Sequence, residues 1–208
     1  AVKVLVEGTI PPGGISGVSL PSAPVVDLNG PDALFSYSAS YTTGTGPIAI
    51  AETDLTITDT DGLHQITQMS LSMTGGGSAD QIKLSSAGII MAAANGLTVS
   101  SSGSSIIISG SATRAIYEDL LQLVQFENAQ TSGVVTSGNR VISITVTDTL
   151  GDVSTPVTST ITVTRANTNP VATTDAVTAT EDGSVTFNPL ANDTDPESDS
   201  LTITTIDG

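Results

Sequence analysis

Alternation between apolar and hydroxyl-bearing residues is the pattern that most constrains the fold of this chain. Residues 141–147 read VISITVT, so Ile142, Ile144 and Val146 share one face of an extended segment. Successive side chains of a β-strand point to opposite faces, and period-two alternation therefore predicts a half-buried strand. The pattern recurs, with Gly and Pro clusters between the runs, and predicts an all-β chain with strands at 66–73, 158–164 and 201–205.

One segment departs from this period. In residues 113–126, Ile116, Leu120, Leu123 and Val124 follow helical spacing, and Thr113 is suited to an N-cap. We expect one or two helical turns there, leading into a strand near 123–126. The predicted architecture is a β-sandwich with one short helical crossover.

Composition marks the expected boundaries. Residues 1–23 hold a candidate strand, Val2–Val6, and a linker rich in Pro, Gly and Ser, and residues 24–165 form one long sandwich unit. Residues 166–170 are a linker, because Pro170 holds Asn169 in an extended conformation. A second unit occupies 171–208, and about 38 residues are too few to close a sandwich. We therefore expect a partial repeat and a chain that is a piece of a longer protein.

The charge balance limits the possible partners. Lys and Arg total 5 against 21 Asp and Glu, which gives a net charge of −16. Such a chain is repelled by nucleic acid and by anionic lipid, and it attracts divalent cations. A hydrophobic share of 38% argues against disorder, and no apolar run is long enough to insert into a membrane.

Several short motifs occur in a consistent order along the chain. The first unit contains PVVDLNG at 24–30, DLTITDTDG at 54–62 and YEDLL at 117–121, and the second contains NPVA at 169–172, TEDG at 180–183 and NPLANDTDP at 188–196. In this order they resemble bacterial cadherin-like repeat proteins, the large secreted adhesins that often carry RTX export sequences. The resemblance implies an Ig/cadherin-like β-sandwich, an incomplete second repeat, calcium at domain junctions and a secreted or cell-surface location. Such repeats usually carry Asp-Pro-Asp-Gly-Asp where this chain has residues 195–199, DPESD, so Ser198 replaces the residue best suited to a positive φ.

The acidic turns are the candidate calcium sites. Calcium takes six to eight oxygen ligands, which clustered carboxylates and carbonyls on loops can supply. We also expect the turn before the last strand to lie at the N-terminal pole of the sandwich, bringing Asp148 and Asp152 close to Asp27 and Asn29. The alternative is that these residues only provide turn chemistry through side-chain hydrogen bonds to the backbone. The candidate ligands of Ca2+ are Asp27, Asn29, Glu52, Asp54, Asp59, Asp61, Asp148, Asp152, Asp182, Asp193, Asp195 and Asp199.

Catalytic residues are not predicted. His64 is the single histidine, and no Gly-x-Ser-x-Gly elbow precedes a helix. With no Trp, three Tyr and three Phe, little is present to stack on a sugar ring. We therefore expect a protein that is not an enzyme.

The leading functional hypothesis is a structural extender or adhesion segment, with calcium rigidifying junctions to neighbouring repeats of the same protein. One alternative is a module that binds polysaccharide or a cell-surface protein ligand, and another is an accessory domain of a secreted enzyme. Head-to-tail self-association is a further alternative, in which the Val2–Val6 strand of one molecule fills an open sheet edge of the next.

Overall fold

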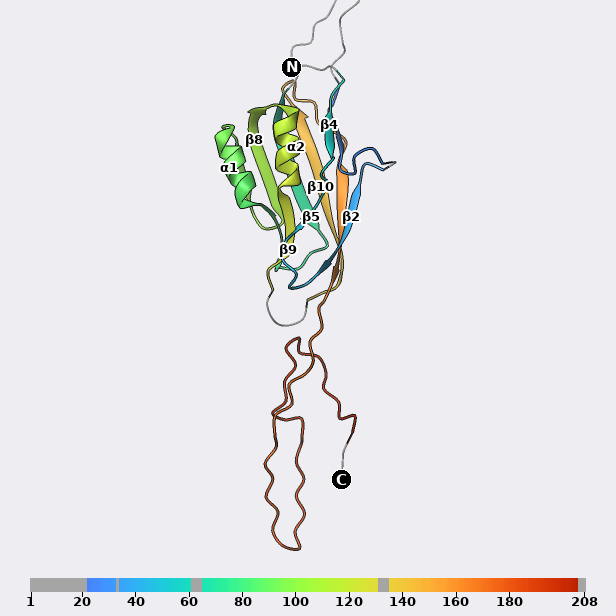
Figure 1. Ribbon diagram of the computed structural model, residues 1–208, viewed down its shortest axis with the longest axis vertical. Coiled ribbons are helices and arrows are strands. Elements are labelled where there is room, and N and C mark those ends of the chain that lie inside the picture. The colour runs from blue at the N-terminus through green and yellow to red at the C-terminus, as the bar shows by residue number, and fades with distance from the viewer. Residues whose placement is uncertain (1–21, 33, 61–64, 131–134, 206–208) are drawn as a thin grey trace, which may run out of the picture.

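The computed structural model describes residues 22–32, 34–60, 65–130 and 135–205. Within these ranges the chain forms a two-layer β-sandwich followed by an extended C-terminal segment (Figure 1). The elements are β1 (Val25–Asp27), β2 (Tyr37–Thr42), β3 (Ile48–Ala49), β4 (Thr56–Thr58), β5 (Ile66–Thr74), β6 (Asp80–Leu84), α1 (Ser86–Ala94), β7 (Thr98–Ser101), β8 (Ser105–Ala112), α2 (Arg114–Gln122), β9 (Val124–Asn128), β10 (Gly138–Asp148) and β11 (Val157–Thr164).

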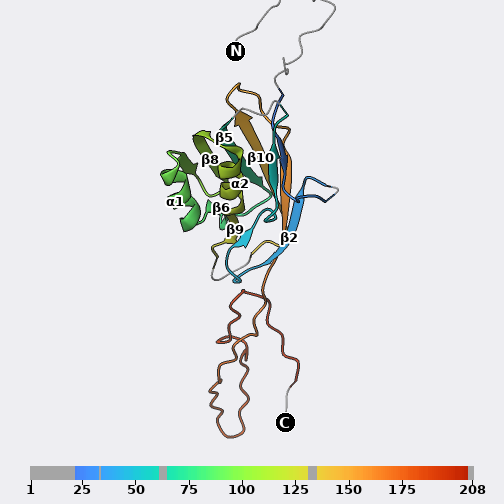
Figure 2. The ribbon, with the colours of Figure 1, turned by 45° about the horizontal axis from the view of Figure 1, so that its top comes forward.

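One layer is a six-stranded sheet in the order β2-β11-β10-β5-β8-β7. Its pairs are antiparallel except β2–β11, which is parallel. The other layer contains a three-stranded sheet, β3-β9-β6, and the pair β1-β4. Both helices lie on the side of this second layer (Figure 2). The predicted sandwich is confirmed.

The strongest alternating runs form the central strands. In β10, Ile142, Ile144 and Val146 are fully buried, while Ser143 and Thr145 between them are partly exposed. The predicted runs 66–73 and 158–164 lie within β5 and β11, which flank β10. Alternation locates these strands because one face of the sheet is covered by the second layer and the other is not.

The predicted helical crossover is α2. The Thr113 hydroxyl accepts a hydrogen bond from the Ile116 backbone N–H at 3.4 Å, as an N-cap does. The helix buries Tyr117, Leu120 and Leu121 and leads directly into β9. The predicted helix and the predicted strand after it are both present.

A second helix, α1, was not predicted, and the expectation of a single crossover is wrong. Its sequence, SAGIIMAAA, is apolar apart from Ser86 and shows no amphipathic period. The signals present are the N-cap Ser85, whose hydroxyl accepts from the Gly88 N–H at 3.2 Å, and the high helix propensity of Ala. Gly88 allows close packing, because a Cβ there would lie 2.6 Å from the Leu84 side chain.

The C-terminal segment contains no named strand within residues 166–205. A single isolated bridge joins Val171 and Thr194, and the strand expected at 201–205 is not formed. Val177, Val185 and Phe187 are exposed, since no second layer covers them. Strands without a packed face are marginal in water, which accounts for the missing strand. The candidate strand Val2–Val6 lies outside the described residues.

We predict that the buried Tyr117 makes stability fall at alkaline pH. Its hydroxyl donates to the Gly110 carbonyl at 2.7 Å, and burial raises the pKa of Tyr117 from 10.0 to about 12. A raised pKa means that the folded state favours the neutral phenol. The contribution of Tyr117 to the free energy of unfolding is therefore complete below pH 10 and declines between pH 10 and 12. Melting temperatures of wild type and Tyr117→Phe between pH 8 and 12 test this. At the lowest pH of this series the variant should be less stable by about 1 kcal/mol, because it lacks the hydrogen bond, and its melting temperature should fall less steeply as the pH rises. Parallel curves would contradict the prediction.

Candidate functional site

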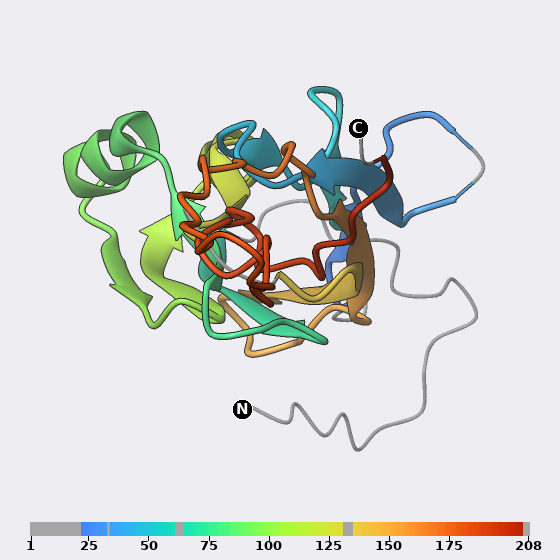
Figure 3. The same ribbon diagram turned by 90° about the horizontal axis from the view of Figure 1, so that it is seen from below.

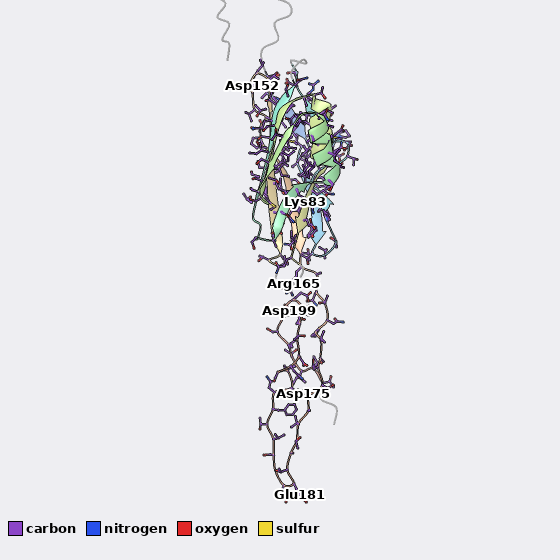
Figure 4. The ribbon with its side chains drawn as sticks, turned by 90° about the vertical axis from the view of Figure 1, so that its left-hand side faces the viewer. Lys83, Asp152, Arg165, Asp175, Glu181 and Asp199 are labelled. Atoms are coloured by element: carbon purple, nitrogen blue, oxygen red, sulfur yellow. The ribbon has the colours of Figure 1, made fainter. Side chains whose placement is uncertain are left out.

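The turn between β10 and β11 lies at the N-terminal pole, as expected from the sandwich topology. Figure 4 places Asp152 at the end of the sandwich opposite the C-terminal segment. One carboxylate oxygen of Asp148, Oδ1, accepts the backbone N–H groups of Leu150 at 2.8 Å and Asp152 at 2.9 Å. The other oxygen, Oδ2, is buried and has no hydrogen-bond partner among the described residues. Gly151 adopts φ +89°, which completes the turn.

A second turn, at 195–199, has the same backbone arrangement. Asp195 Oδ1 accepts the N–H groups of Glu197 at 2.9 Å and Asp199 at 3.0 Å. Ser198 stands where the first turn has Gly151 and adopts φ +63°. The replacement of Gly by Ser therefore does not prevent the turn, although a side chain in this region is disfavoured. Both turns use the first carboxylate to cap backbone groups, as the turn-chemistry alternative predicts.

The two turns differ in the cations beside them. Arg165 Nη2 lies 2.5 Å from Asp199 Oδ2 in the second turn. The hydrogen bond to Asp199, together with the charges of Asp199, Glu197 and Asp195, raises the pKa of Arg165. The remaining Lys and Arg in the described ranges contact other groups: Lys83 pairs with Glu127, Arg114 binds the Asp59 carbonyl, and Arg140 pairs with Asp80. The first turn is therefore without a Lys or Arg partner in the described part of the chain.

Two other predicted segments meet each other. The N–H of Asn29 donates to Asp27 Oδ1 at 3.0 Å, and the N–H of Glu52 donates to the carbonyl of the residue before Asn29 at 2.9 Å. Gly30 adopts φ +61°, and a Cβ there would lie 2.4 Å from the carboxyl carbon of Asp54. The structure thus brings Asp27, Asn29, Glu52 and Asp54 into one region.

The expected group of Asp27 and Asn29 with Asp148 and Asp152 is not formed. Asp27 pairs with Thr56 of β4, and its Oδ1 accepts the N–H of Asn29. No three His, Asp or Glu side chains in the described ranges are grouped so as to hold a metal ion. Calcium binding by the individual residues stays a prediction.

The remaining predicted ligands lie apart from these regions. Asp59 is nearly buried, with Oδ1 accepting from the Ser22 hydroxyl at 3.1 Å. Asp193 Oδ1 accepts the N–H of Thr173 at 2.7 Å within the C-terminal segment. Asp182 is exposed and directly follows Glu181, which Figure 4 shows at the tip of that segment. Asp61, together with His64, lies outside the described residues.

Sequence reasoning missed a buried polar network near the C-terminal pole of the sandwich. Arg140 Nε donates to Asp80 Oδ2 at 2.7 Å, and both side chains are almost completely buried. Asn128 Nδ2 donates to Asp80 Oδ1 at 2.8 Å, and the Asn128 N–H donates to the Tyr41 hydroxyl at 3.2 Å. One signal was present: the alternation through Ile142 places Arg140 on the inward face of β10. Its partner was not predictable, because Asp80 lies 60 residues away in the chain.

Comparison with known proteins yields a match for the C-terminal segment. Residues 167–208 match the family model described as bacterial Ig domain. This segment is similar to bacterial Ig domains. Such domains are common in extracellular surface proteins and typically serve structure or binding instead of catalysis. The match covers the C-terminal segment and does not extend over the sandwich, so the likeness to a bacterial Ig domain holds for that segment alone.

The curated proteins and the solved structures were also compared with the chain. No curated protein was found to match the chain. Among solved structures, the solution structure of CaCohA2 from Clostridium acetobutylicum aligns with a TM-score of 0.40 and 13% identity, over 69% of this chain and 92% of that one. Neither helix in the described ranges is long and apolar enough to cross a membrane.

We predict that Asp80→Ala destabilises the sandwich strongly. It leaves the Arg140 guanidinium buried without its carboxylate, and loss of one partner of a buried ion pair costs about 3–5 kcal/mol. Lys83→Ala is the control, because Lys83 pairs with Glu127 at a partly exposed position and should cost at most about 1 kcal/mol. Urea denaturation measures both. Equal, small losses would show that the buried pair is not a major contributor to stability.

Proposed function

We propose that this chain is a structural extender segment of a secreted, calcium-binding surface adhesin of the cadherin-like, RTX-associated type. The observation that carries the proposal is the end-to-end path of the chain. β1 begins at the pole that holds Asp152, and β11 ends at the opposite pole, from which the C-terminal segment continues in the same direction (Figures 1 and 4). A module entered at one end and left at the other adds its full length to a stalk.

The exit from the sandwich supports this role. β11 pairs along its length with β2 in the parallel register Ser159–Tyr37 to Thr164–Thr42. Beyond the strand, the Thr43 N–H donates to the Thr164 carbonyl at 3.1 Å, and the Ala166 N–H donates to the Thr43 hydroxyl at 2.9 Å. The chain is therefore held to the sandwich until it enters the linker.

Calcium at the N-terminal pole is the second part of the proposal. Asp148 offers a buried carboxylate oxygen without a hydrogen-bond partner in the described residues, and Asp152 is joined to it through the turn. Two carboxylates supply only some of the six to eight oxygens that calcium needs. Carbonyls, water or a neighbouring repeat would supply the others, so the ion would stiffen the connection to that repeat.

We predict that calcium raises the melting temperature and that a chelator lowers it. At a free concentration of about 100 times Kd, binding adds about 2.7 kcal/mol to the free energy of unfolding. Calorimetric titration of wild type and of the double variant Asp148→Asn, Asp152→Asn tests this, because Asn retains an oxygen for the turn but loses the charge. Asp119→Asn, at an exposed position on α2 and not among the candidate ligands, is the control. Absence of both binding heat and a melting shift would refute the calcium part and leave the extender role untouched.

A binding role is the second candidate, favoured by the outer face of the six-stranded sheet. The outward side chains of β11 are all Thr, those of β2 are Ser, Ser and Thr, and the exposed face of β10 carries Asn139, Val141, Ser143, Thr145 and Thr147. Ser and Thr hydroxyls both donate and accept hydrogen bonds. Within the named strands of this sheet, the outward positions carry no charged residue, which suits a neutral, hydroxyl-rich polysaccharide.

The two roles predict different results in a glycan array and in pull-down with cell-surface material, each with calcium and with chelator. An extender should bind no glycan and should scatter X-rays as an elongated particle. Specific binding of a neutral glycan, abolished when Thr145→Glu and Thr160→Glu place charge on the outer face, would instead establish the binding role. The matched control is Glu181→Gln, at the tip of the C-terminal segment (Figure 4).

A further inference from the structure

The junction between the sandwich and the C-terminal segment has its own cation. The 195–199 turn carries Asp195, Glu197 and Asp199, and Arg165 at the end of the sandwich faces it. Arg165 Nη2 contacts Asp199 Oδ2 at 2.5 Å and Asn167 Oδ1 at 3.4 Å. Figure 4 shows Arg165 and Asp199 next to each other where the two parts of the chain meet.

A second contact fastens the same turn to the linker. Glu197 Oε2 accepts the backbone N–H of Thr168 at 3.1 Å and the Thr168 hydroxyl at 2.6 Å. Two of the three carboxylates of the turn are thus bound to residues immediately after β11, and the third, Asp195, caps the turn itself. Neither contact involves the apolar side chains of the segment.

The charge at this junction is already partly compensated. The hydrogen bond to Asp199, together with the charges of Asp199, Glu197 and Asp195, raises the pKa of Arg165, so these carboxylates favour the charged guanidinium. An acidic turn with an arginine in place has less need of a metal ion, because the guanidinium supplies both positive charge and directed donors. The turn at 148–152 has the same backbone arrangement and no such partner among the described residues.

We propose that Arg165 is an internal counter-ion that fastens the 195–199 turn to the sandwich, so that this junction is held without a metal ion. The cadherin-like resemblance implies calcium at junctions in general, whereas this one would respond to ionic strength and not to chelation. A cavity of about 450 Å³, lined in part by Arg165, Glu127 and Glu197, adjoins the contact and leaves it open to dissolved salt. The inference does not depend on calcium binding at the N-terminal pole.

The test measures how accessible the linker at 166–170 is to a protease. We expect Arg165→Ala to raise the rate of proteinase K cleavage there about two- to fivefold, the range for an exposed ion pair. Small-angle scattering should show a wider distribution of overall lengths. Sodium chloride at about 1 M, where the Debye length is about 3 Å, should have a similar effect on wild type. Adding calcium or a chelator should change neither measurement.

Two controls keep the result interpretable. Lys83→Ala removes a charge from an ion pair within the sandwich and should leave linker cleavage unchanged. The charge exchange Arg165→Glu with Asp199→Arg should restore protection that either single change removes, which a purely structural defect would not allow. The proposal is overturned if Arg165→Ala behaves like Lys83→Ala, if the exchange fails to rescue, or if a chelator alone frees the linker of wild type.

Discussion

The buried ion pair between Arg140 and Asp80 is the interaction on which the sandwich depends most directly. Arg140 belongs to the six-stranded sheet and Asp80 to the three-stranded sheet, so the pair joins the two layers across the core. The pair is well satisfied: Arg140 also donates to the carbonyls of Gly138 at 3.0 Å and Thr136 at 2.6 Å, and Asp80 also accepts from Gly77 at 2.7 Å. The mutual attraction of a buried pair and its additional hydrogen bonds offset the desolvation penalty that both charges incur.

What was predictable from the sequence depended on how local each signal is. The strands β5, β10 and β11 show period-two alternation because they are covered on one face only, and α2 shows both a cap at Thr113 and helical spacing. The helix α1 escaped prediction because its residues are almost uniformly apolar, so no period distinguishes its faces. Strand pairing was also out of reach, since the contacts of β6 with β9 connect residues far apart in the chain.

For the acidic turns, too, the local structure was predictable from the sequence and the distant contacts were not. Residue type and spacing identified Asp148 and Asp195 as turn residues, and each does cap two backbone N–H groups. The two turns differ in the side chain that lies beside them. The Asp195 turn has Arg165, which comes some thirty residues earlier in the sequence and pairs with Asp199. The same local turn therefore occurs in two different electrostatic environments, because the fold places an arginine beside only one of them. The close approach of Gly30 to Asp54 is of this kind too, because it joins two loops that are separate in the sequence.

The parallel pairing of β2 with β11 has a consequence for a chain under tension. Six registered residue pairs, from Ser159–Tyr37 to Thr164–Thr42, connect the last strand to a strand that runs in the same direction. A pull on the residues after β11, resisted at the opposite pole, would slide these strands past each other along their axes. Hydrogen bonds between parallel strands are evenly spaced, so such sliding loads all of them together instead of one after another. A pull on the linker would thus load the end of the sandwich in shear, along the strand axes.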